Sequence, residues 1–120
     1  MELSFDGIGQ VAATFATQET EEKPLAIGMA VALTGDGTVG LGTAGAAPCG
    51  VILALEGDQT AAVQVSGFVR VGYTGSTAPT VGWGSLGVDG SGGVQTVSTG
   101  GRSVLIVQVD SVDKSAVIKL

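Results

Sequence analysis

The 120-residue chain contains no histidine and a single cysteine, Cys49. Histidine is the commonest general base and the commonest metal ligand, so its absence removes the simplest routes to acid–base catalysis and to a zinc centre. One cysteine cannot form an internal disulfide or a thiolate cluster. Cys49 has no imidazole anywhere in the chain to activate it, and we interpret it as a buried structural thiol.

Charged residues are also scarce, at 13% of the chain, with five Lys or Arg against eleven Asp or Glu. The net charge of −6, without a basic stripe, repels phosphate backbones, so nucleic acid is not an expected partner. No basic stretch followed by an apolar run opens the chain, and no apolar run approaches the ~20 residues that a membrane span needs. We therefore expect a soluble protein, made in the cytoplasm, that does not engage a membrane.

Small residues are abundant instead, with 21 glycines and a hydrophobic fraction of 44% that consists mostly of valine and alanine. Each such side chain buries little area, and burial stabilises by only roughly 25 cal/mol per Å². A chain of this kind gains from burying further surface against copies of itself or against a partner.

The chain divides into two zones at Pro24. Residues 1–24 are polar and acidic, and we interpret them as an N-terminal arm or loop, in which residues 11–15 form either a short strand or part of a flexible arm. Residues 25–120 are rich in valine, threonine and glycine and predict a β domain.

Turn signals recur every 8–12 residues in the second zone, which is typical of a small sandwich or barrel. Strands are predicted at residues 30–34, 39–42, 50–55, 62–73, 83–88, 94–97, 104–109 and 116–120. No segment of helical length shows a 3.6-residue apolar period. The sequence thus predicts an all-β single domain of eight to ten short antiparallel strands with Gly-rich turns.

Two segments are expected to carry the core and the subunit contact. In residues 62–73 valines and Tyr73 alternate on one face, and Gly67 predicts a bulge or a bend. Residues 104–109 are almost continuously apolar, which is typical of a strand covered on both faces. In so small a domain the second cover is expected to be another subunit.

Candidate chemistry is weak throughout the chain. Most acidic residues fall at predicted turns, where they bond local backbone, and the pattern G-x-G-x-x-G at residues 35–40 lacks the helix that a phosphate-binding loop needs. Loop carboxylates such as Asp36, Asp58 and Asp89 offer calcium ligands without an EF-hand spacing. Trp83, Tyr73 and Phe68 are interpreted as core or interface anchors, with a sugar-stacking platform as the alternative. We expect no catalytic, cofactor-binding or metal site, no cofactor, and no enzymatic activity.

The order of these pieces resembles the capsid decoration (cement) proteins of tailed bacteriophages over roughly residues 25–120. The resemblance rests on a Gly-x-x-Val-x-Leu segment at 28–33, Gly-Val-Ile-Leu-Ala at 50–54 and a valine-rich strand pair at 63–71. A Gly-x-Leu-x-Val-Asp-x-x-Gly-x-Val hairpin at 84–94 and a valine-rich final strand complete it.

This resemblance implies a virion protein on the outer capsid surface that bridges major capsid protein subunits and stabilises the expanded head. It also implies a homotrimer as the common form. The acidic residues 1–24 are then a candidate docking arm. Two alternatives stay open: another virion β module, from a tail or a head fibre, and a carbohydrate-binding β-sandwich that uses Trp83 and Tyr73.

Overall fold

The computed structural model describes residues 8–19, 24–75 and 77–120, and in these residues the chain is all-β without a helix. Ten strands follow one another: β1 (Val11–Thr17), β2 (Ala30–Gly35), β3 (Thr38–Gly40), β4 (Gly50–Glu56), β5 (Thr60–Ser66), β6 (Phe68–Gly72), β7 (Gly82–Val88), β8 (Val94–Thr96), β9 (Arg102–Asp110) and β10 (Ser115–Lys119). The predicted fold class is confirmed, and every strand predicted from residue 25 onward is present within a few residues of its expected bounds.

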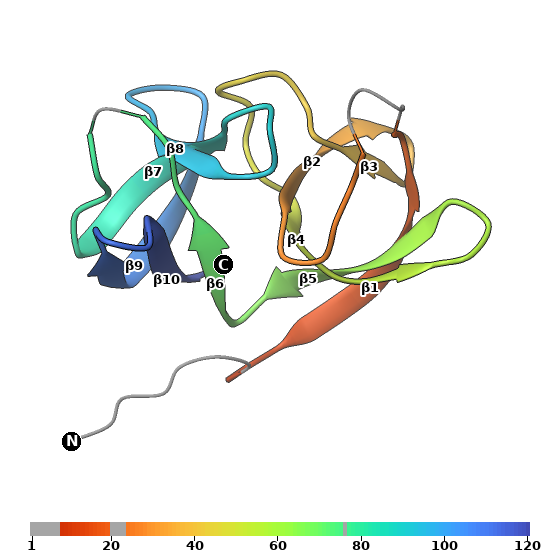
Figure 1. Cartoon of the computed structure of the whole chain (residues 1–120), viewed down its shortest axis with the longest axis horizontal. Coiled ribbons are helices and arrows are strands. Elements are labelled where there is room, and N and C mark those ends of the chain that lie inside the picture. Colours follow the sequence, from red (N-terminus) through yellow and green to blue (C-terminus); the bar gives the residue numbers. More distant parts are fainter. Residues whose placement is uncertain (1–7, 20–23, 76) are drawn as a thin grey trace.

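The strands form two sheets that lie side by side (Figure 1). β1 to β5 close into a barrel in the order β1-β3-β2-β4-β5, and β6 to β10 form a second sheet in the order β6-β10-β9-β7-β8. Strand pairing is antiparallel except between β1 and β3, which are parallel and meet at Ala16–Thr38 and Thr17–Val39. That parallel pair closes the barrel. The sequence predicted only antiparallel strands, so this pair was not expected.

Strand β1 belongs to the barrel. It pairs with β5 from Val11 to Ala16, so the strand interpretation of residues 11–15 is confirmed and the arm interpretation is wrong for this stretch. The β structure therefore begins well before residue 25. The remaining parts of the predicted arm, residues 1–7 and 20–23, lie outside the described residues.

The chain crosses from the barrel to the second sheet at Gly67, where the predicted bend is found. β5 ends at Ser66 and β6 begins at Phe68, and Gly67 has a φ of 95°. A Cβ on Gly67 would lie 2.5 Å from the carbonyl carbon of Gly9. Gln64, which is buried, donates from Nε2 to the carbonyls of Ser66 (3.0 Å) and Phe68 (3.1 Å) and so fixes both sides of the crossing.

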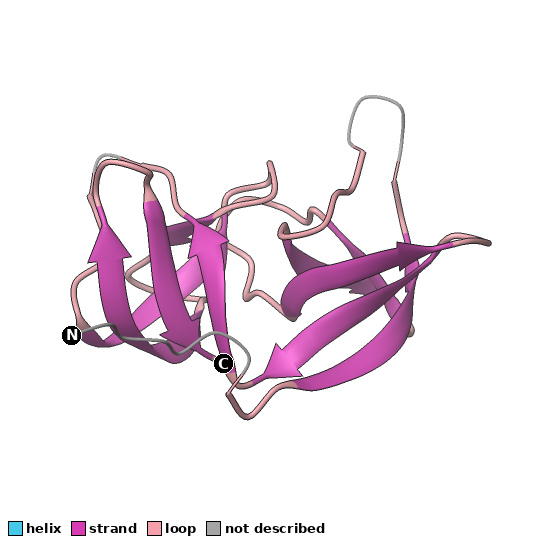
Figure 2. Cartoon of the chain, turned by 60° about the horizontal axis from the view of Figure 1, so that its bottom comes forward, coloured by secondary structure: helices cyan, strands magenta, loops and turns pink. Residues whose placement is uncertain are grey.

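Two hydrophobic clusters fill the molecule. The barrel interior contains Leu25, Val31, Val39, Leu41, Ile52, Ala61 and Val63. The second cluster lies under β6 to β10 and includes Val69, Val71, Tyr73, Leu86, Val88, Val104, Ile106 and Ile118, together with Ala30, Ala32 and Val51 from the barrel strands β2 and β4. Because barrel side chains complete the second core, the two sheets pack as one domain, and Figure 2 shows the loops of the two parts meeting between them.

The two apolar segments singled out in the sequence behave differently. The valines of residues 63–71 and Tyr73 do face the cores, as expected, although Gly67 divides them between two clusters. Strand β9 buries Val104 and Ile106 on the inner face, whereas Leu105 and Val107 are only half-buried. Full burial of β9 on both faces is therefore not found, because the side chains of Leu105 and Val107 on its outer face are only partly buried.

Candidate functional site

Arg102 and Cys49 meet where the second sheet joins the barrel. From β9, the Nη1 of Arg102 donates to the carbonyls of Cys49 (3.1 Å) and Pro48 (3.4 Å), and Nη2 donates to the carbonyl of Val65 (3.4 Å). Partial burial raises the pKa of the Cys49 thiol, and the positive charge of Arg102 offsets only part of this rise. The thiol therefore stays protonated at neutral pH, which fits a structural role, although it is half-buried rather than fully buried.

Asp89 organises the turn between β7 and β8. Its Oδ1 accepts hydrogen bonds from the backbone N–H groups of Ser91 (2.7 Å) and Gly93 (3.0 Å), and its Oδ2 accepts one from the Thr74 hydroxyl (2.8 Å). Partial burial alone would raise the pKa of this carboxyl, but the hydrogen bonds from Ser91, Thr74 and Gly93 together hold it below its ordinary value. Because the backbone N–H of Thr74 also donates to Val94 (2.9 Å), this turn ties the chain after β6 to β8.

Asp110 plays the same part at the turn between β9 and β10. Its Oδ1 accepts from the backbone N–H groups of Val112 (2.9 Å) and Asp113 (3.1 Å). Hydrogen bonds from Asp113 and Val112 lower its pKa. The turn interpretation of the acidic residues is thus confirmed for Asp89 and Asp110.

The loop carboxylates weighed as calcium ligands are not brought together. Nowhere in residues 8–19, 24–75 and 77–120 do three or more carboxylate or thiol groups gather in a way that would hold a metal ion. Residues 35–40, with the G-x-G-x-x-G pattern, form the β2–β3 hairpin, in which Gly37 has a φ of 60°. The pattern therefore reflects turn geometry.

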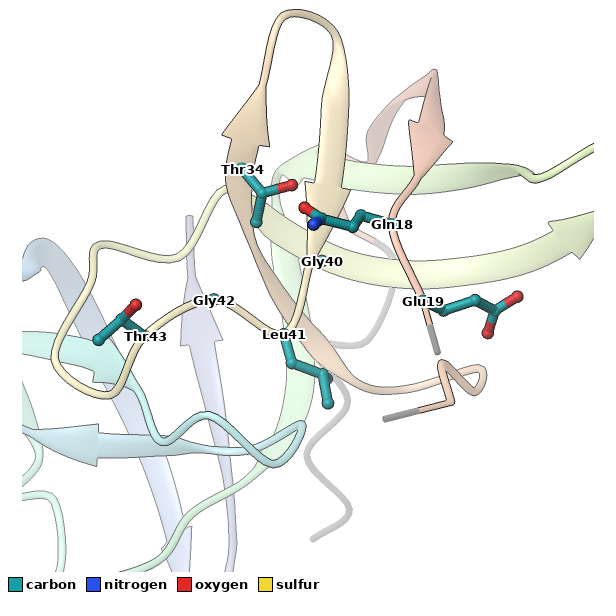
Figure 3. A pocket seen from close by; sticks show the side chains of 7 residues that line it. All are labelled: Gln18, Glu19, Thr34, Gly40, Leu41, Gly42 and Thr43. Carbon is teal, nitrogen blue, oxygen red and sulfur yellow. The ribbon is translucent and has the colours of Figure 1, made fainter. Parts of the chain in front are cut away.

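A hollow of about 280 Å³ opens between the end of β1 and the segment that follows β3. Figure 3 shows the side chains of Gln18 and Thr34 on either side of Gly40, with the carboxylate of Glu19 directed away from them. Glu19 is the one ionisable side chain among the described residues of the lining, and its Oε2 already accepts a hydrogen bond from the backbone N–H of Leu25 (2.9 Å). The hollow thus offers neutral polar groups without an acid–base pair.

The three aromatic residues considered for sugar stacking, Trp83, Tyr73 and Phe68, do not lie together on one surface. Tyr73 is 4% exposed inside the second core, so its ring is not available to stack on a sugar. Trp83 is 73% exposed on the outer face of β7, and Phe68 is half-buried on β6. The anchor interpretation is therefore confirmed for Tyr73 as a core residue, whereas Trp83 lies on the surface.

The outer face of the second sheet is the most distinctive surface of the described chain. Register places Trp83 of β7 opposite Leu105 of β9, Leu105 opposite Lys119 of β10, and Lys119 opposite Phe68 of β6. This row was not predicted, because cross-strand register is not visible in the sequence of a single strand. The contacts of Arg102 were not predicted either, although an isolated arginine in an almost uncharged segment is a signal for a buried partner.

The fold defines an all-β protein in which a closed five-stranded barrel packs against a second five-stranded sheet. Comparison of the chain with models of known protein families gives no match, and a search among curated proteins gives no significant match either. The described part of the chain offers no helix with the length and apolar character needed to pass through a lipid bilayer.

Proposed function

We propose that this chain is a non-enzymatic decoration protein of a tailed bacteriophage head. In this function it binds the outer surface of the expanded capsid, bridges neighbouring major capsid protein subunits, and resists their separation. It works as a homotrimer in the assembled virion and is made in the cytoplasm of the host. No cofactor or nucleic acid takes part.

The observation that carries the proposal is that large hydrophobic side chains are exposed on a protein with few charged residues. Large hydrophobic side chains stay exposed on both the barrel and the second sheet: Ile8, Val11, Ile27, Leu33, Leu55, Val81, Trp83 and Val112. Only 13% of the residues are charged. Exposed apolar surface in a weakly charged protein is typical of one that is buried against a partner while it works.

The segments that carry the resemblance also support the proposal, because each coincides with an ordered β element. Residues 28–33 enter and form β2, residues 50–54 lie in β4, residues 63–71 include the crossing at Gly67, and residues 84–94 form the β7–β8 hairpin. The pattern is therefore one of strands and turns in this fold.

Co-sedimentation tests the function directly. The purified chain is mixed with expanded empty heads of the virus that encodes it, with unexpanded proheads as the matched control, and the pellets are quantified. We expect saturable binding to expanded heads and greater resistance of those heads to heat. A chain that stays in the supernatant with both particles contradicts the proposal, and binding to purified tails instead would assign it to a tail module.

The carbohydrate-binding alternative has less support, since burial of Tyr73 leaves Trp83 without the second aromatic partner on which it depended. A glycan array with reproducible, Trp83-dependent hits would restore it. Sedimentation equilibrium of the free chain tests the trimer separately, and a monomer at all concentrations would contradict that part of the proposal.

A further inference from the structure

We propose that the outer face of the second sheet, centred on Trp83 and Leu105 with Lys119 beside them, docks onto a partner protein through an apolar depression bordered by carboxylates. The partner is the major capsid protein if the chain decorates a phage head, so in this respect the inference rests on the proposed function. We call this surface, defined by Trp83, Leu105 and Lys119, the Trp83 face.

The geometry of the Trp83 face is that of an anchor with a polar surround. Trp83 and Leu105 are directly opposed on adjacent strands, and Lys119 is opposed to Leu105 on the next strand. Because neighbouring strands are ~4.8 Å apart, these three residues span only about 10 Å. The next pair along the same strands, Ser85 and Ser103, supplies small hydroxyl groups at the border.

Trp83 projects from the Trp83 face, with 73% of its surface exposed. The hollow of about 130 Å³ that it borders lies on the inner side of β7, because Leu86 and Ile106 of the second core belong to its lining. Val81, which lies just before β7, is also largely exposed. A projecting ring gives a partner a large apolar side chain to enclose. Exposed tryptophans in such settings are the residues most enriched at the energetic centres of interfaces.

The outer face of the second sheet, which includes the Trp83 face, has a net charge opposite in sign to that of the whole chain. Among the described outward-facing side chains of β6, β7, β9 and β10, the charged ones are two cations, Arg70 and Lys119, and one carboxylate, Asp110. Arg70 lies near Asp110, which leaves Lys119 as the cation nearest to Trp83 and Leu105. In a protein with a net charge of −6, this local excess favours an acidic partner surface.

Two copies of the Trp83 face fit one another poorly. In a two-fold contact the same surface meets itself, so each copy brings two cations and one carboxylate and the contact has an excess of positive charge. Like charges at the border of an apolar contact oppose association. The charge pattern therefore disfavours a contact of this face with its own equivalent and favours an acidic surface as the occupant.

Binding of matched variants to expanded empty heads tests the inference. Trp83→Ala is compared with Thr14→Ala, which shortens an exposed side chain on barrel strand β1, and Lys119→Gln with Lys114→Gln, which removes the same charge from the β9–β10 turn. We expect Trp83→Ala to weaken binding at least about tenfold. Lys119→Gln should weaken it several-fold and reduce its salt dependence, while both controls bind as the parent chain does. Circular dichroism and urea unfolding establish that each variant is folded.

Hydroxyl-radical footprinting gives an independent readout at a single residue, because Trp83 is the only tryptophan of the chain. Oxidation of Trp83 should be fast in the free chain and suppressed on the heads. If the parent chain binds heads while Trp83 stays reactive and Trp83→Ala binds equally well, the inference is overturned and the proposed function stands. If the parent chain does not bind heads, the proposed function fails. Protection of Trp83 in the free chain at high concentration would assign the face to self-association and overturn the inference.

Discussion

The guanidinium of Arg102 donates a 3.1 Å hydrogen bond to the backbone carbonyl of Cys49, and this contact joins β9 of the second sheet to the segment that enters barrel strand β4. The same group reaches the carbonyls of Pro48 and Val65, so one side chain serves three backbone acceptors at the junction. Relative placement of the two sheets thus depends on a polar contact as well as on the shared apolar core.

Replacement of Arg102 by methionine keeps most of the aliphatic stem and removes every donor. We expect a loss of about 1.5–3 kcal/mol in the free energy of unfolding, because the hydrogen bonds of a charged group are lost and half-buried carbonyls are left without partners. Urea denaturation measures this loss. Arg102→Lys keeps the charge without the planar guanidinium, so its free energy of unfolding should lie between those of the parent chain and the methionine variant. A methionine variant as stable as the parent would show that solvent replaces these contacts without cost.

The crossing at Gly67 gives a second prediction. Gly67→Ala places a Cβ at 2.5 Å from the backbone of Gly9 in a residue with a φ of 95°, so we expect destabilisation by more than about 1 kcal/mol. Gly57→Ala is the matched control, since nothing lies within 4 Å of its Cβ position and its φ is not in the left-handed region. The control should be neutral or slightly stabilising. Equal thermal midpoints for the two variants would contradict the close approach at Gly67.

Much of the fold follows from the sequence because its signals are local. Glycine and aspartate mark turns such as the one after Gly35, and the two-residue alternation on both sides of Gly67 predicts strands and a bend. Each of these signals is carried by neighbouring residues. The strands from residue 25 onward, the hairpins and the bend at Gly67 could therefore be predicted without coordinates.

The long-range features could not be predicted in the same way. The parallel pairing of β1 with β3 depends on tertiary closure, and β1 itself is composed of small residues with weak polarity contrast. The alignment of Trp83, Leu105 and Lys119 depends on register across three strands, including a register shift at Val107 of β9, opposite Val117 and Ile118 of β10. The candidate site thus depends on how the strands pair, and this pairing cannot be predicted from the residue pattern of one strand.

Acid pH should weaken the fold in part through Asp89. Its pKa is lower in the folded chain than in the unfolded one, so the unfolded state binds more protons as the pH falls. The stabilisation is fully present above the unfolded pKa, near 4, and is lost as the pH falls through the lower folded pKa. Unfolding experiments between pH 6 and about 2 should show a shallower pH dependence for Asp89→Asn than for the parent chain. Asp110→Asn provides the comparison with an aspartate in an exposed turn. An identical dependence of unfolding on pH for Asp89→Asn and the parent chain would contradict this role of Asp89.

Cys49 should react slowly with thiol reagents in the folded protein. Burial raises the pKa of this thiol, and the thiolate is the reactive form. Alkylation by iodoacetamide at pH 8 should therefore be markedly slower in the native protein than in urea, when followed by mass spectrometry. As the pH rises above the unfolded pKa, the unfolded state releases its thiol proton first, so stability should decline. Equal native and denatured alkylation rates would show that Cys49 is accessible and unperturbed.

Strand β9 provides the sharpest contrast between neighbouring positions. Ile106 is 2% exposed in the second core, whereas Val107 is half-buried on the strand that carries the outer face. Ile106→Asp should prevent folding, because an unpaired carboxylate in an apolar core costs several kcal/mol against a total stability of ~5–15 kcal/mol. Val107→Asp should leave a folded chain with a lowered unfolding midpoint. Circular dichroism and size-exclusion chromatography distinguish these outcomes. A folded Val107→Asp chain that has lost its oligomeric state would place Val107 in a subunit contact, and an unfolded one would mean that this position is covered more completely than the strand pattern indicates.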